Sequence, residues 1–113
     1  MINLSNYQTR FQEWQKRNFG GCELSDMIHG MSEEVGEMNH WYLKSKQGIR
    51  GVTSEEAKHK MADAFVDTVV FGMQAMTALG VDVEGTLTRT FEEVLKRDWL
   101  HNPDGTGYSQ HNK

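Results

Sequence analysis

The sequence contains very few residues that interrupt helices or cross-link chains. Its 113 residues include one proline, Pro103, and one cysteine, Cys22. A single cysteine excludes an intrachain disulfide, and every segment before Pro103 is free to be helical. The longest apolar run, Val69 to Met73, is far too short to cross a bilayer, so we predict no membrane-spanning segment.

The sequence also lacks an excess of positive charge, since its formal net charge is −4. This balance argues against a nucleic acid polymer or an anionic membrane as partner. It does not exclude a small phosphate-bearing ligand, because a bound metal can invert the local charge. The first residues, Met1 to Ser5, have neither the basic start nor the apolar stretch of a signal peptide, so we expect a soluble cytoplasmic protein.

Apolar residues recur at helical spacing in four segments, and no segment alternates as a β-strand does. The predicted helices run from about Leu4 to Asn18, Ser25 to Ser45, Thr53 to Leu79 and Asp82 to Trp99. We therefore predict an all-α fold, with one helical bundle domain over residues 1–100. Residues 101–113 are predicted to be a polar C-terminal tail with turn signals.

Local signals fix several of the predicted helix ends. Ser25 is a plausible N-cap of the second helix, and Thr53 with Glu56 three residues later forms a capping box for the third. Gly20 and Gly21 are expected to end the first helix, because glycine pairs favour turns.

Carboxylates lie beside the apolar stripes of the second and third predicted helices. Glu34 lies beside the stripe of the second helix, and Glu37 follows one turn later. Asp63 and Asp67 are one turn apart on the third helix. If these two helices pack antiparallel through their apolar faces, the four carboxylates converge.

Either carboxylate pair alone is as well explained by a solvated helix edge. Both pairs together predict a cation, because partly buried like charges repel one another and protonate unless a cation neutralises them. No basic residue lies between Ser25 and Trp41 to do so. Carboxylate oxygens are ligands for Mg²⁺, which keeps waters and substrate phosphates in its remaining positions.

Three segments of the sequence resemble the MazG-like all-α nucleotide pyrophosphohydrolases: Ser32 to Met38, Met61 to Phe71 and Leu79 to Glu84. The family pattern E-E-x-x-E is matched in full by Glu33, Glu34 and Glu37. In the family, the second acidic element has the form E-x-x-D, with its two acidic residues three positions apart. Here Asp63 and Asp67 are four positions apart, so the second element departs from the family form. Either aspartate is a candidate for the family's final Asp position, and we choose Asp67 because the apolar run after it aligns best.

This resemblance implies a four-helix MazG-like bundle completed by oligomerisation, as a dimer or a tetramer. It also implies Mg²⁺-dependent hydrolysis of a nucleoside triphosphate between its α- and β-phosphates, with Mn²⁺ as a substitute metal. The products are the nucleoside monophosphate and pyrophosphate. The implied metal ligands are Glu34, Glu37, Asp63 and Asp67, and either Glu33 or Glu34 is the implied proton acceptor.

Basic and aromatic residues supply candidates for the rest of a nucleotide site. Lys96 and Arg97 occupy the region where the family has phosphate-contacting residues, although pairing with the glutamates one turn earlier is the alternative. Trp14 and Trp41 are candidates for stacking on the base, although aromatic residues at helical spacing more often lie in a core or an interface.

Two other functions fit parts of the same sequence. One is a non-enzymatic helical interaction module whose acidic edges are only surface. The other is a di-iron carboxylate bundle, because Glu37 with His40 and Glu56 with His59 both form Glu-x-x-His. We favour coincidence for these motifs, since His40 is predicted to point toward solvent.

Overall fold

The computed structural model describes residues 1–105 and consists of four α-helices, with no β-strand in that range. They are α1 (Leu4–Phe19), α2 (Leu24–Gln47), α3 (Ser54–Ala78) and α4 (Val83–Leu95). The predicted all-α class is therefore confirmed. The predicted polar tail is described only as far as residue 105, and residues 106–113 lie outside the described part.

Most helix ends follow the local sequence signals. The Thr53 side chain accepts a hydrogen bond from the backbone N–H of Glu56 at 3.0 Å, and the Asp82 carboxylate accepts one from Gly85 at 2.7 Å. The prediction of Ser25 as an N-cap was wrong. Helix α2 begins at Leu24, so its N-cap is Glu23, two residues before the predicted cap, and Ser25 lies inside the first turn.

The fourth helix is shorter than predicted and ends before Trp99. The backbone N–H of Lys96 bonds to the carbonyls of Glu92 and Glu93, and that of Arg97 bonds to Val94. This tightening of the last turn ends α4 at Leu95. The chain then turns, and Trp99 lies outside the helix.

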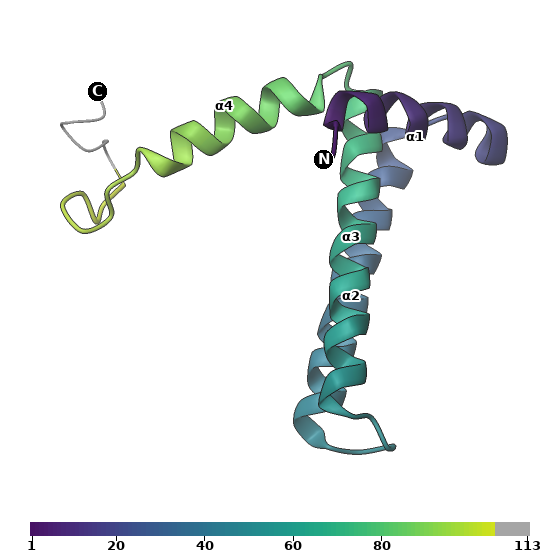
Figure 1. The fold of residues 1–113 in the computed structure, drawn as a ribbon, viewed down its shortest axis with the longest axis vertical. Helices are drawn as coiled ribbons and strands as arrows, with labels where there is room; N and C mark the ends of the chain where they lie inside the picture. The colour runs from purple at the N-terminus through teal and green to yellow at the C-terminus, as the bar shows by residue number, and fades with distance from the viewer. Residues whose placement is uncertain (106–113) are drawn as a thin grey trace.

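Helices α2 and α3 form a long antiparallel hairpin, the vertical pair in Figure 1. Gly48 ends α2 with a left-handed backbone (φ 64°), and residues 48–53 connect the two helices. Small or flexible side chains line their contact, which lets the two backbones approach closely. These are Met27, Met31 and Met38 on α2 and Ala57, Ala64 and Ala75 on α3.

Helices α1 and α4 do not lie along this hairpin but extend from one end of it, to opposite sides (Figure 1). The bend between α3 and α4 is 110°. The radius of gyration is 18.0 Å, whereas a compact domain of this length has a radius of about 13 Å. The four helices of one chain therefore do not close into a bundle.

Within residues 1–105, no single helix has the length and apolar character needed to cross a membrane. Helices α3 and α4 have that length and apolar character only when they are counted together, and the chain bends sharply between them.

One side of the hairpin is left uncovered and apolar. Val35 is 48 % exposed and Phe65 is 58 % exposed, although the sequence pattern predicted both in apolar stripes. Phe65 and Val69 lie one turn apart on α3, and Ile28, Val35 and Tyr42 follow one another every seven residues on α2, so each set shares one face of its helix. We call this surface the apolar hairpin face, and it consists of Ile28, Val35, Tyr42, Phe65, Val66 and Val69.

Gln8 joins α1 to the connection between α3 and α4. Its side-chain amide donates to the Val81 carbonyl at 2.9 Å, and its oxygen accepts from the Val83 backbone N–H at 2.8 Å. Val83 is buried, with 2 % of its surface exposed. Gln8 thus satisfies a buried backbone donor at the start of α4.

Replacing Gln8 by methionine is expected to destabilise the protein by about 1–3 kcal/mol, because the buried Val83 N–H loses its acceptor. Urea unfolding followed by circular dichroism measures this change. Gln12→Met, on an exposed position of the same helix, is the matched control. Equal stability of the two variants would show that the Gln8 bonds contribute nothing to the fold.

Candidate functional site

The predicted carboxylates lie along the side of the hairpin opposite the apolar hairpin face. Glu34 lies at the α2–α3 contact, one turn before Met38, and is only partly exposed. Glu33 and Glu37 are one turn apart on the outer side of that contact. Asp63 and Asp67 occupy the corresponding side of α3. The antiparallel pairing therefore brings the acidic edges of both helices to one side, but the four carboxylates are not gathered into one cluster among residues 1–105.

Glu34 is the carboxyl group with the clearest electrostatic perturbation. Burial raises the pKa of Glu34, and the negative charges of Asp67, Glu33 and Glu37 raise this pKa further. Asp67 is thus the carboxylate of α3 whose charge contributes to the raised pKa of Glu34.

These carboxylates are not neutralised by the protein itself. In the described part of the chain, the salt bridges join His59 to Glu55 and His101 to Asp98, and neither involves the acidic side of the hairpin. Oxygen donors without a basic partner suit a hard divalent cation such as Mg²⁺. Within residues 1–105, however, no three carboxylate, imidazole or thiol groups are gathered closely enough to hold a metal ion.

The two Glu-x-x-His motifs do not meet. His59 pairs with Glu55 at 3.3 Å on the surface, where both side chains are exposed. His40 is also exposed, and its ring contacts Trp41 edge to face with 5.2 Å between the ring centroids. The arrangement gives no support to a di-iron centre.

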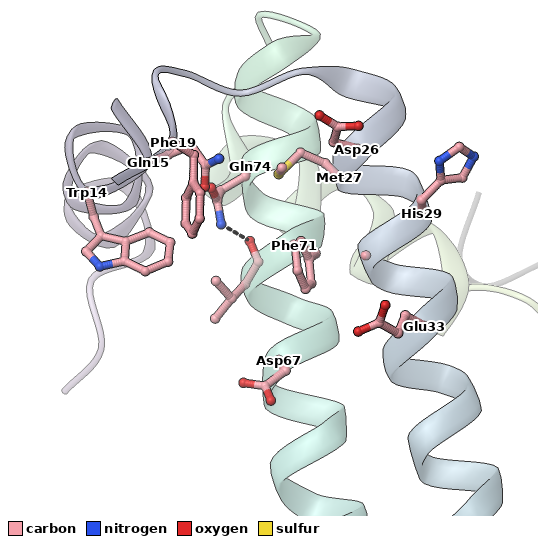
Figure 2. A pocket seen from close by; sticks show the side chains of 12 residues that line it. Trp14, Gln15, Phe19, Asp26, Met27, His29, Glu33, Asp67, Phe71 and Gln74 are labelled. Atoms are coloured by element: carbon pink, nitrogen blue, oxygen red, sulfur yellow. Dashed lines mark hydrogen bonds between the residues drawn. The ribbon is translucent and has the colours of Figure 1, made fainter. Parts of the chain in front are cut away.

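A pocket of about 570 Å³ adjoins the acidic side, between the end of α1 and the upper half of the hairpin (Figure 2). Glu33 and Asp67 border one end of it. Trp14, Phe19 and the side-chain amide of Gln74 lie toward the other end (Figure 2). The pocket thus has an acidic end and an aromatic end with polar amides. Its lining residues are Trp14, Gln15, Phe19, Asp26, Met27, His29, Gly30, Glu33, Asp67, Val70, Phe71 and Gln74.

A glycine in the middle of α2 shapes this pocket. A Cβ atom on Gly30 would collide with the ring of Phe71 on α3. Because Gly30 has no side chain, the Phe71 ring packs against the backbone of α2 and forms part of the pocket wall.

The other predicted site residues divide between this pocket and distant positions. Trp14 lines the pocket, but Trp41 does not, and Trp41 instead has the Lys60 ammonium 5.6 Å from its ring centroid. Lys96 and Arg97 follow the far end of α4, which points away from the hairpin (Figure 1). Within one chain, these two basic residues do not approach the acidic side.

Sequence reasoning did not identify Phe19, Phe71, Gln15 or Gln74 as site residues. Gln15 and Gln74 are 6 % and 2 % exposed, and in the sequence each follows an apolar residue, Phe11 or Val70, by four positions on the apolar side of its helix. A buried glutamine inside an amphipathic helix is uncommon and indicates that its amide forms hydrogen bonds in the interior.

The perturbed carboxyl group predicts a pH dependence of stability. The pKa of Glu34 is higher in the folded chain than its ordinary value of 4.5, so above about pH 4.5 the folded state binds more protons than the unfolded state. The contribution of Glu34 to stability is therefore lost as the pH rises through the folded pKa. Urea unfolding of the wild type and of Glu34→Gln should show a difference that grows from pH 4.5 to neutral pH. A constant difference would show that Glu34 titrates alike in both states.

No protein-family model matches this chain, and comparisons with curated proteins and with solved structures find no significant match.

Proposed function

We propose that this protein is a Mg²⁺-dependent nucleotide pyrophosphohydrolase that cleaves a nucleoside triphosphate to the monophosphate and pyrophosphate. The observation that carries the proposal is the pocket with two unlike ends. The end lined by aromatic rings and amides suits a base. The acidic end adjoins half-buried Glu34, which forms no salt bridge with a basic residue among residues 1–105. The resemblance of the acidic segments to MazG-like enzymes supports the same reaction.

We assign the metal to the acidic side of the hairpin. Glu34, Glu37 and Asp67, with Asp63 as a further ligand, would hold Mg²⁺ or Mn²⁺. The metal, when bound, neutralises phosphate charge and lowers the pKa of a coordinated water. Without a cation these carboxylates repel one another: burial raises the pKa of Glu34, and the charges of Asp67, Glu33 and Glu37 raise it further.

The reaction needs a proton acceptor close to the attacking water. A water oxygen forms a bond to the α-phosphorus, and the bond from that phosphorus to the bridging oxygen breaks, so pyrophosphate leaves with the bridging oxygen. Glu33, which borders the pocket, or Glu34 takes the proton of the water. Trp14 stacks on the base at the other end of the pocket.

The proposed assembly is a homo-oligomer, a dimer or a tetramer. A single chain leaves the apolar hairpin face uncovered and has a radius of gyration of 18.0 Å. Helix α4 has 13 residues and is therefore about 20 Å long, so it holds Lys96 and Arg97 far from the acidic side of their own chain. We assign these two residues to the phosphates bound by another copy.

The test is an assay of pyrophosphate release across the common ribo- and deoxynucleoside triphosphates. We expect release of pyrophosphate and a nucleoside monophosphate with Mg²⁺, and none with EDTA. Absence of turnover with every triphosphate would count against the proposal. If Mg²⁺ with nucleotide also fails to raise the melting temperature, the protein is better described as a helical interaction module.

A further inference from the structure

Gln74 is the most deeply buried large side chain of the described residues, with 2 % of its surface exposed. It lies in the middle of a helical segment that is otherwise apolar, and its amide forms part of the wall at the aromatic end of the pocket (Figure 2). Burying an amide costs free energy unless hydrogen bonds replace those lost to water. A structural role for Gln74 would therefore require strong internal partners.

The internal partners of Gln74 are weak. Its Nε2 donates to the Val70 carbonyl one turn earlier at 3.4 Å, the dashed line in Figure 2. Its Oε1 accepts from the Cys22 thiol at 3.8 Å. Burial raises the pKa of Cys22, so the thiol remains a protonated, weak donor. Each polar atom of Gln74 thus has one partner among residues 1–105, which leaves one amide N–H and one oxygen lone pair for a further hydrogen bond.

The surroundings of Gln74 suit a flat ring. Trp14 and Phe19 line the same end of the pocket, and Phe71 lines its middle (Figure 2). The Gln15 amide is held in the same wall, because its Nε2 donates to the Gly21 carbonyl at 3.1 Å. A planar ligand among these groups meets apolar surface on its faces and an amide at its edge.

We propose that Gln74 determines base specificity by pairing its amide with an adjacent donor and acceptor on the edge of the nucleobase. These bonds select a base that carries an exocyclic amino or oxo group next to a ring nitrogen over the same ring without that group. This inference rests on the proposed function and names the part of the substrate that selects it. A site built to form such bonds rejects an analogue that lacks them, because its own buried groups are then left unpaired.

The experiment compares two triphosphates on wild type and on Gln74→Met, which keeps the length of the side chain and removes its amide. One triphosphate carries the base that the wild type prefers, and the other carries the same ring without its exocyclic group. The wild type should favour the first in kcat/KM by about 10- to 100-fold. In Gln74→Met this ratio should fall close to one. The exposed control Gln12→Met should keep the wild-type ratio.

A merely structural role gives a different result, since damage to the fold lowers turnover of both triphosphates equally and leaves their ratio unchanged. That outcome would overturn the proposal. If Gln74→Met does not fold, the comparison of the two triphosphates on the wild type is the test. Equal kcat/KM for the two would overturn base recognition by the Gln74 amide, and a preference of about 10- to 100-fold would support it.

Failure of the proposed function can be separated from failure of this inference. Free nucleosides in EDTA need no metal and no hydrolysis, and their binding is followed by tryptophan fluorescence in a Trp41→Phe, Trp99→Phe background that leaves Trp14 as the reporter. If no triphosphate is hydrolysed but nucleosides bind with a preference that Gln74→Met removes, the base site stands and the hydrolase proposal falls. If triphosphates are hydrolysed but Gln74→Met keeps the wild-type preference, the hydrolase stands and this inference falls.

Discussion

Replacing Glu34 by glutamine should reduce Mg²⁺-dependent pyrophosphate release by more than about 100-fold, because loss of a metal ligand exceeds the 10- to 100-fold effect typical of residues that only orient ligands. The same substitution should raise the melting temperature. Burial and three neighbouring carboxylates raise the pKa of Glu34, so its charge at neutral pH opposes folding. Glutamine has nearly the same shape and carries no charge.

Activity and stability are therefore expected to change in opposite directions, which distinguishes a functional carboxylate from a structural one. A thermal unfolding scan and the pyrophosphate assay measure the two effects on one sample. Glu13→Gln, an exposed position on α1, removes the same charge and should change neither quantity. Retained activity in a folded Glu34→Gln protein would count heavily against the proposed site.

Adding Mg²⁺ extends the same comparison. A divalent ion that binds only the folded protein stabilises it by mass action, and the wild type should gain more than Glu34→Gln. The stability gap between the two proteins should therefore narrow as Mg²⁺ is raised. An identical response of both proteins would place the metal elsewhere.

Replacing Phe65 by glutamate should dissociate the proposed oligomer into single chains of 13.0 kDa. Phe65 is 58 % exposed in the isolated chain, so a charge there costs little within one copy. In an oligomer that covers the apolar hairpin face, the same charge is desolvated at a cost of several kcal/mol. The dissociation constant should therefore increase by at least about 100-fold.

Light scattering after gel filtration measures the mass, and Thr90→Glu on the exposed side of α4 is the control. Activity should fall together with the mass, since Lys96 and Arg97 are proposed to serve another copy. A wild type that is already monomeric, or a Phe65→Glu protein with unchanged mass, would show that the apolar hairpin face is not the interface.

The sequence predicted those features that depend on short-range geometry. Thr53 was located correctly as a cap because its hydrogen bond is decided by residues within one turn, whereas the cap predicted at Ser25 was wrong. The acidic sides of α2 and α3 were predicted because helical spacing fixes the relative positions of Glu34, Glu37 and Asp67. Both results need only the period of an α-helix and the antiparallel contact of two neighbouring segments.

Features that depend on tertiary contacts were missed. An apolar pattern does not say which neighbour covers it, and so Val35 was expected in a core but is exposed in the single chain. The glutamines of the pocket were overlooked because polar residues are ordinarily assigned to the surface. Their burial arises only when the end of α1 packs across the hairpin, and no local signal specifies that contact.

Gly30 has a consequence for engineering this protein. In the interior of a helix, glycine is about 1 kcal/mol less favourable than alanine, so a search for thermostable variants would choose Gly30→Ala early. Here the added methyl group would displace the Phe71 ring from its position against α2. The missing side chain that weakens α2 at this position is therefore what gives the Phe71 ring its place in the pocket wall, and a gain in helix propensity would change the shape of the pocket.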